Sequence, residues 1–267
     1  MALTYGAAPF SPDSRGKYNI KEDLPETFLY WEDFDKRIRA VFNGEVIVDS
    51  RKAKALHETG QFMVLYFPRE DVDMNLLQKS EYQTECPHKG TASYWSVQTG
   101  GRKAENAVWS YEAPIDSAAF LDGYMAFFFD KMDDWYQEDE KVYAHLRNPY
   151  HGFEILSSSQ NVKVTRNGEV AAESSHPRIL FETSLPPRYY LPAEDVRTDL
   201  LRKSDYVTQC PYKGDAQHWH LKMSGDTVED AAWSLPEPIG EGRKVAGYFC
   251  FYPDKVQVEV DGKLLKK

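Results

Sequence analysis

The sequence contains few cysteines and no long hydrophobic run, and each absence excludes a class of protein. Its 267 residues include only three cysteines, Cys86, Cys210 and Cys250. That number is too small for a disulfide-stabilised scaffold and is typical of a reducing compartment. The longest unbroken apolar run, residues 124–129, is far shorter than the roughly 20 residues of a membrane-spanning helix. We therefore expect a cytoplasmic protein that binds no membrane.

Positive charge is also scarce. The 32 lysine and arginine residues are outnumbered by 42 aspartate and glutamate residues, which gives a formal net charge of -10. A chain of this charge repels the nucleic acid backbone unless a local basic patch intervenes, and the sequence has none. We expect no nucleic acid partner. Aromatic residues, at 14%, are abundant, which is typical of β-sheet faces or of aromatic-lined pockets.

The strongest pattern in the sequence is an internal repeat with an offset of 124 residues. Without a gap, residues 37–130 match residues 161–254 at 36 of 94 positions. Such a match predicts a duplicated domain, because each copy is long enough to bury its own core. We expect a flexible leader over residues 1–23, a first domain over 24–148 and a second over 149–267. We also expect the two domains to pack with approximate twofold symmetry.

The secondary-structure signals within each copy are mainly those of β-strands. Short β-branched or aromatic runs alternate with proline and glycine, and Asn43-Gly44 and Asn167-Gly168 each predict a type I′ hairpin. Only residues 71–78, and the acidic residues 133–142 between the copies, resemble short helices. The sequence therefore predicts two tandem all-β domains with short helices.

Several motifs recur in the same order in both copies. They read Asn-Gly-Glu-Val, Pro-x-Glu-Asp-Val, Cys-Pro-x-Lys-Gly, Ala-x-Trp-Ser and Gly-Tyr. This set resembles the family called domain of unknown function 427, sometimes labelled nucleotidyltransferase-like. The resemblance implies a β-tent or Mss4-like fold, related in shape to the drug-binding domain of cereblon and to methionine sulfoxide reductase B. Several of those relatives hold zinc with two Cys-x-x-Cys pairs, which this sequence lacks, so we expect no structural metal and no cofactor.

Aromatic and lysine residues common to both copies are candidates for a ligand pocket. Pockets are apolar clefts with a few polar groups, and a buried indole N–H needs a partner. A packed core is the alternative interpretation of the same aromatic residues. The leading functional hypothesis is a protein that binds a small, cyclic or heteroaromatic ligand, with a site in each domain: Tyr66, Lys89, Trp95, Trp109 and Tyr124 in the first, and Tyr190, Lys213, Trp219, Trp233 and Tyr248 in the second.

Catalysis is the main competing hypothesis. Cys86 precedes His88 and Lys89, which could lower the pKa of its thiol, although a structural turn with Lys89 paired to a carboxylate such as Glu70 explains the same residues. The repeated carboxylates Glu58, Glu70 and Asp71 could perform acid–base chemistry or bind magnesium. The structural alternative is that Glu70 and Asp71 begin a short helix.

Two further hypotheses concern a metal site and a protein-binding surface. His218 and His220 would share one face of a strand, but with no third ligand indicated we expect a surface pair rather than a metal site. A module that binds another protein through an exposed apolar groove is the remaining alternative.

Overall fold

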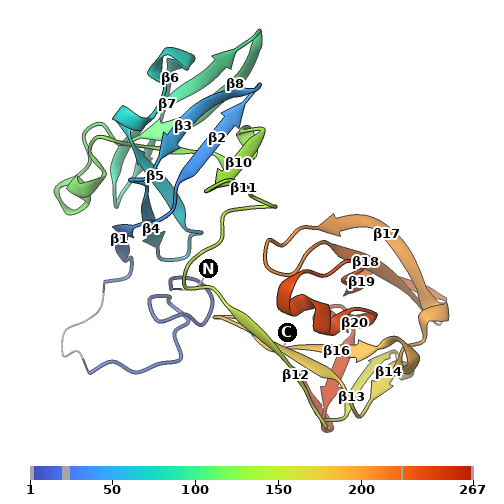
Figure 1. Ribbon diagram of the computed structural model, residues 1–267. Helices are drawn as coiled ribbons and strands as arrows, with labels where there is room; N and C mark the ends of the chain where they lie inside the picture. Colours follow the sequence, from blue (N-terminus) through green and yellow to red (C-terminus); the bar gives the residue numbers. More distant parts are fainter. Residues whose placement is uncertain (1–2, 20–24, 224, 266–267) are drawn as a thin grey trace. The chain divides into compact units, whose positions relative to one another are not determined.

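The computed structural model describes residues 3–19, 25–223 and 225–265. The chain divides into two compact units, Met1–Val142 and Tyr143–Lys267. Each unit contains one seven-stranded and one four-stranded antiparallel sheet (Figure 1). None of the helices in these ranges is long and apolar enough to cross a membrane.

The first unit builds its sheets from eleven strands among the described residues. The seven-stranded sheet has the order β1-β4-β5-β9-β8-β7-β6, and the four-stranded sheet has the order β11-β10-β2-β3. The strands are β1 (Leu29–Asp33), β2 (Ile38–Phe42), β3 (Glu45–Ser50), β4 (Lys54–Glu58), β5 (Val64–Pro68), β6 (Leu77–Cys86), β7 (Gly90–Thr99), β8 (Arg102–Ser110), β9 (Tyr124–Phe127), β10 (Asp134–Gln137) and β11 (Glu140–Lys141).

The second unit repeats this topology. Its sheets have the orders β12-β15-β16-β20-β19-β18-β17 and β14-β13-β21-β22. The strands are β12 (Phe153–Ser157), β13 (Val162–Arg166), β14 (Glu169–Ser174), β15 (Arg178–Glu182), β16 (Arg188–Pro192), β17 (Leu201–Thr208), β18 (Ala216–Met223), β19 (Asp226–Ser234), β20 (Tyr248–Phe251), β21 (Gln257–Val260) and β22 (Lys263–Leu264).

The predicted duplication is confirmed by these strand orders. Trp95 and Trp219 lie on the equivalent strands β7 and β18. Strands keep the offset of 124 residues through β9 and β20, whereas β10 and β21 begin 123 residues apart. The second copy is therefore one residue shorter than the first just before its last hairpin, which the sequence repeat alone does not locate.

Asn-Gly turns close the first hairpin of each unit, as predicted. Asn43 and Gly44 have φ angles of 52° and 82°, and Asn167 and Gly168 have 52° and 81°. Two consecutive left-handed residues define the type I′ turn, whose twist matches that of the flanking strands.

The helical segments are short 3-10 turns. Residues 71–78 contribute to the turns η1 (Arg69–Asp71) and η2 (Met74–Leu76) before β6 begins. The others are η3 (Asp116–Leu121), η4 (Phe129–Lys131), η5 (Ala193–Asp195), η6 (Thr198–Leu200) and η7 (Gly240–Val245).

The helix predicted over residues 133–142 is wrong, because this segment forms the β10–β11 hairpin. Its acidic residues lie at the surface, while Trp135 is buried and stacks on Phe129 with the ring centroids 5.3 Å apart. A single buried aromatic residue outweighs the helix propensity of its charged neighbours.

Both faces of each seven-stranded sheet are covered. On one face, Phe67 of β5 contacts Trp135 of the four-stranded sheet, with ring centroids 6.2 Å apart. On the other face, Tyr66 belongs to an apolar cluster that includes Ala118 and Leu121 of η3. Successive side chains of a strand point to opposite faces, so Tyr66 and Phe67 belong to different cores. We call the face that packs on η3, or on η7 in the second unit, the helical face.

Part of the segment predicted as a leader packs on the first unit. The Gly60 N–H donates to the Thr4 carbonyl at 2.8 Å, and the Thr59 hydroxyl donates to the Phe10 carbonyl at 3.0 Å. The Phe10 and Phe28 rings are 5.0 Å apart. These contacts attach residues 3–11 to the turn that follows β4; residues 1–2 and 20–24 of the predicted leader lie outside the described residues.

Candidate functional site

A cavity of about 190 Å³ opens on the helical face of the first unit. Its lining comes from β4, β5, β7, β8 and the turns beside them. Tyr94 lies directly opposite Trp109, which lies opposite Ala126, which in turn pairs with Tyr66. Side chains of directly opposed residues share a face, so this register gathers the aromatic rings. The lining residues are Leu56, Glu58, Phe62, Val64, Tyr66, Lys89, Tyr94, Trp109, Tyr111 and Phe128.

An ion pair between Lys89 and Glu58 lies in this cavity. The two side chains are only 10% and 15% exposed. The Lys89 ammonium also lies 5.9 Å from the centre of the Tyr111 ring. Removing a charged group from water is costly unless the group is paired, and here the ammonium and the carboxylate pair with each other.

The Cys-Pro-x-Lys-Gly motif explains how Lys89 reaches the cavity. It forms the turn between β6 and β7, in which the Lys89 N–H donates to the Cys86 carbonyl at 3.3 Å. Gly90 has a φ of +99°, and a Cβ there would meet the Ala113 carbonyl at 3.4 Å. Glycine avoids both the backbone strain and the crowding at this position. The motif is therefore a structural turn that places Lys89 at the cavity.

Three tyrosine hydroxyls differ in their partners. The Trp109 indole N–H donates to the Tyr66 hydroxyl at 3.3 Å, and Tyr94 shares a hydrogen bond of 2.9 Å with Thr84. Within the described ranges, the Tyr111 hydroxyl has no hydrogen-bond partner. Burial raises the pKa of both Tyr66 and Tyr111, which keeps their hydroxyls protonated. The cavity therefore presents a neutral donor, the Tyr111 hydroxyl, that no group of the described residues accepts.

The structure brings together Tyr66, Lys89 and Trp109 of the predicted first site, but not Trp95. Trp95 lies opposite Val108 on the other face of the sheet, where it is 2% exposed and has Arg69 over its ring at 5.6 Å. Its neighbour Tyr94 takes the place in the cavity. Because successive side chains of a strand point to opposite faces, only one of these two adjacent aromatic residues can line the cavity.

Tyr124 lies outside the cavity. It packs edge-on against Trp31, with centroids 5.2 Å apart, and lines a separate hollow of about 450 Å³. The rim of that hollow carries charged groups that are paired with each other, such as Lys52 with Glu70.

The candidate catalytic carboxylates are not brought together. Glu58 lies in the cavity, Glu70 pairs with Lys52 at 2.6 Å, and Asp71 accepts a hydrogen bond from Ser50 at 2.6 Å. Lys89 does pair with a carboxylate, but that carboxylate is Glu58 and not Glu70. Glu70 and Asp71 do lie in a short 3-10 turn after Pro68, although Arg69 and not Glu70 begins it.

Cys86 is partly buried beside the aromatic cluster, and its thiol is free. The two groups that could activate it are engaged elsewhere. Lys89 pairs with Glu58, and the His88 imidazole lies 3.3 Å from the Thr27 hydroxyl at the surface. Cys250 is fully buried, and burial raises the pKa of its thiol.

His218 and His220 do not form the surface pair that we predicted. His218 lies opposite Trp233 on the helical face, is 2% exposed and contacts the Thr208 hydroxyl at 3.1 Å. His220 follows at a β-bulge and accepts the Asp230 N–H at 3.0 Å. Across the described residues, no three His, Cys, Asp or Glu side chains are grouped to hold a metal ion.

The second unit keeps the framework of the site. The Trp233 indole donates to the Tyr190 hydroxyl at 3.0 Å, and Lys213 pairs with both oxygens of Glu182 at 2.6 Å. Glu182 also contacts His151 at 2.9 Å. Burial raises the pKa of Glu182, but these bonds outweigh it and leave the pKa below its ordinary value.

The other two residues predicted for the second site lie apart from this framework. Trp219 packs in the opposite core, where its indole donates to Ser234 at 2.9 Å. Tyr248 packs at the edge of the helical-face cluster, and the Arg178 guanidinium lies over its ring at 5.0 Å.

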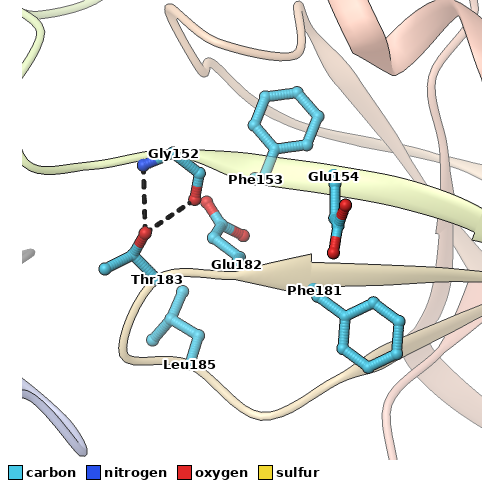
Figure 2. Close-up of a pocket in the computed structure, with 7 residues that line it drawn as sticks. All are labelled: Gly152, Phe153, Glu154, Phe181, Glu182, Thr183 and Leu185. Carbon is cyan, nitrogen blue, oxygen red and sulfur yellow. Dashed lines mark hydrogen bonds between the residues drawn. The ribbon is translucent and has the colours of Figure 1, made fainter.

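An open hollow of about 460 Å³ lies beside Glu182, at the edge of β12 and β15. Figure 2 shows the Thr183 hydroxyl between the N–H and the carbonyl of Gly152, which it contacts at 3.0 and 2.9 Å. Of its lining, only Glu154 and Glu182 are charged. The hollow therefore offers fewer polar groups than the smaller cavity of the first unit.

Comparison with known proteins gives one family. The model of a domain of unknown function (DUF427) matches the chain twice, over residues 30–138 and 154–262. A search of curated proteins finds no match. The chain belongs to the DUF427 family as a tandem two-domain member.

Proposed function

We propose that the protein binds a small ligand carrying a single ring in the cavity of the first domain. The observation that carries this proposal is the Lys89–Glu58 ion pair at an aromatic-lined cavity. An ion pair of this kind adds little to stability compared with apolar packing. Its position beside a cavity favours a role in binding.

The size of the cavity limits the ligand. Its volume of about 190 Å³ is somewhat larger than the roughly 150 Å³ cavity that holds a benzene molecule. Sites for drug-sized ligands usually occupy about 300–1,000 Å³. One ring with one or two polar substituents fits these limits.

The polar groups define the chemistry of the ring. Lys89 and Tyr111 supply hydrogen-bond donors, and Glu58 supplies an acceptor. Because one cation and one anion face the cavity, their charges cancel, and a neutral ligand with both a donor and an acceptor suits them. A cyclic amide or a heteroaromatic ring meets this description.

A fragment screen tests the proposal. Thermal shift and quenching of tryptophan fluorescence, with benzamide, 2-pyridone and related single-ring compounds, should identify binders of the parent protein. Tyr111→Phe removes a hydroxyl that bonds to no described residue. The variant should fold normally and bind about 3- to 10-fold more weakly, the equivalent of one hydrogen bond.

Tyr252→Phe is the matched control, because it removes a hydroxyl from the second unit at the position equivalent to Phe128. It should leave binding to the first domain unchanged. If no fragment binds the parent, or if binding survives both Tyr111→Phe and Trp109→Ala in folded protein, the proposal is wrong.

A further inference from the structure

We infer that the helical face of the second domain binds a small anion, a carboxylate or a phosphate group, rather than a neutral ring. The inference goes beyond the proposed function and shares with it only the idea that this face holds a ligand. It depends on residues that differ between the two copies.

Charge balance distinguishes the two faces. In the first domain, the sheet and its turns contribute two ion pairs, Lys54 with Asp33 and Lys89 with Glu58. In the second domain, serine replaces Asp33 and arginine replaces Val64 at the equivalent positions. Among the described residues, the equivalent positions then carry three cations against one carboxylate: Arg178, Arg188 and Lys213 against Glu182.

Arg188 is the main addition. It lies opposite Leu180, and its guanidinium is 5.7 Å from the centre of the Trp233 ring. Burial raises the pKa of both Tyr190 and Tyr252, that of Tyr252 to about 12. The positive charge of Arg188 lies close enough to both hydroxyls to oppose this rise. Guanidinium groups stack on aromatic faces and bind carboxylate or phosphate through two parallel hydrogen bonds.

Neither arginine of this face has an acidic partner. Arg188 and Arg178 contact the rings of Trp233 and Tyr248, but no described carboxylate forms an ion pair with them. Two other arginines of the second unit do have such partners: Arg166 pairs with Asp226 at 2.9 Å, and Arg197 pairs with Asp199 at 2.8 Å. Two guanidinium groups on one face therefore keep their hydrogen-bonding capacity for a ligand.

A buried histidine adds a third polar group. His218 replaces Tyr94 of the first domain, and its ring is parallel to that of Tyr252 at 6.0 Å. One ring nitrogen contacts Thr208, while Nδ1 is buried and has no partner among the described residues. Buried polar atoms without a partner are rare in proteins, and a bound ligand is one explanation for such an atom.

Titration of the full chain with anions tests the inference. Inorganic phosphate and benzoate serve as the two anionic probes and benzamide as the neutral analogue of benzoate, at constant ionic strength set with chloride. Calorimetry should show saturable binding of at least one anion that Arg188→Val weakens. Benzamide binding that comes from the first domain should not change in this variant, and any benzamide binding that depends on Arg188 should be at least about 10-fold weaker than that of benzoate. The better anion identifies the group that the site prefers.

Arg188→Val restores the residue of the first domain and should weaken anion binding about 10-fold or more, because it removes a charge-assisted contact. Arg188→Lys keeps the charge without the paired hydrogen bonds, so its anion affinity should lie between those of the parent protein and Arg188→Val. Arg197→Gln is the control, because it removes a surface arginine that has its own carboxylate, and binding should not change.

Absence of saturable anion binding would overturn the inference, as would binding of benzamide that equals that of benzoate and is weakened equally by Arg188→Val. So would unchanged affinity in a folded Arg188→Val variant. These outcomes are independent of the proposed function, because fragment binding to the first domain is followed separately through Tyr111→Phe.

Discussion

The ion pair at the cavity of the first domain gives the sharpest stability prediction. Replacing Glu58 by methionine leaves the Lys89 ammonium, 10% exposed, without its carboxylate. Breaking a buried pair by removing one partner costs about 3–5 kcal/mol. Since a domain is stable by only about 5–15 kcal/mol, the variant should lose a large part of the stability of the first domain.

The double variant Glu58→Met with Lys89→Met separates pairing from packing. Replacing both charges by apolar groups of similar size is often neutral or stabilising, so the double variant should be more stable than Glu58→Met. Urea unfolding gives the free energies, and hydrogen exchange assigns each transition to its domain, because the two units need not unfold together.

The second domain supplies the comparison. Glu182 has two partners, Lys213 and His151, so Glu182→Met should cost at least as much as Glu58→Met. The reasoning is refuted if Glu58→Met costs less than about 1 kcal/mol, the value typical of an exposed pair. It is also refuted if the double variant is less stable than the single one.

Three further predictions concern acid sensitivity, the N-terminal segment and metal. Burial lowers the pKa of His57 below its ordinary 6.5 despite its contact with Glu32, so the unfolded chain binds a proton first as the pH falls. The stability of the first domain should therefore decrease from pH 7 toward pH 5, and His57→Phe should flatten this dependence in urea titrations. Deleting residues 1–11 should remove the exchange protection of the Gly60 N–H, which donates to Thr4; unchanged protection would contradict the packing of this segment. A chelator should leave the melting temperature unchanged, and elemental analysis finding about one zinc per chain would contradict that expectation.

Most of the fold can be predicted from local sequence patterns and from the internal repeat. Asn43-Gly44 predicts its hairpin because its conformation is determined by two adjacent residues. The repeat predicts equal strand orders because an ungapped match leaves no room for a different connection. The prediction for residues 133–142 is wrong because their charges favour a helix, whereas the burial of Trp135 against the other sheet determines the structure.

The candidate site is predictable only in part. Tyr66, Lys89 and Trp109 are found from the repeat, since each recurs 124 residues later. The choice between Tyr94 and Trp95 depends on the register of β7 against β8, which shifts at an irregularity just after Trp95. A one-residue change in register moves a side chain to the other face, and composition does not reveal it.

The two copies together separate the framework of the site from its variable lining. The lysine–glutamate pair and the tryptophan–tyrosine hydrogen bond occur in both domains with similar geometry. The residues around them differ: Val64, Tyr94 and Tyr111 of the first domain correspond to Arg188, His218 and Leu235 of the second. Packing alone would favour apolar residues at these positions, because a partly buried arginine or a buried histidine has to be compensated for its lost hydration. Their presence in only one copy is the expected result if the two domains recognise ligands of different charge, and exchanging Val64 and Arg188 between the domains would then exchange their preferences.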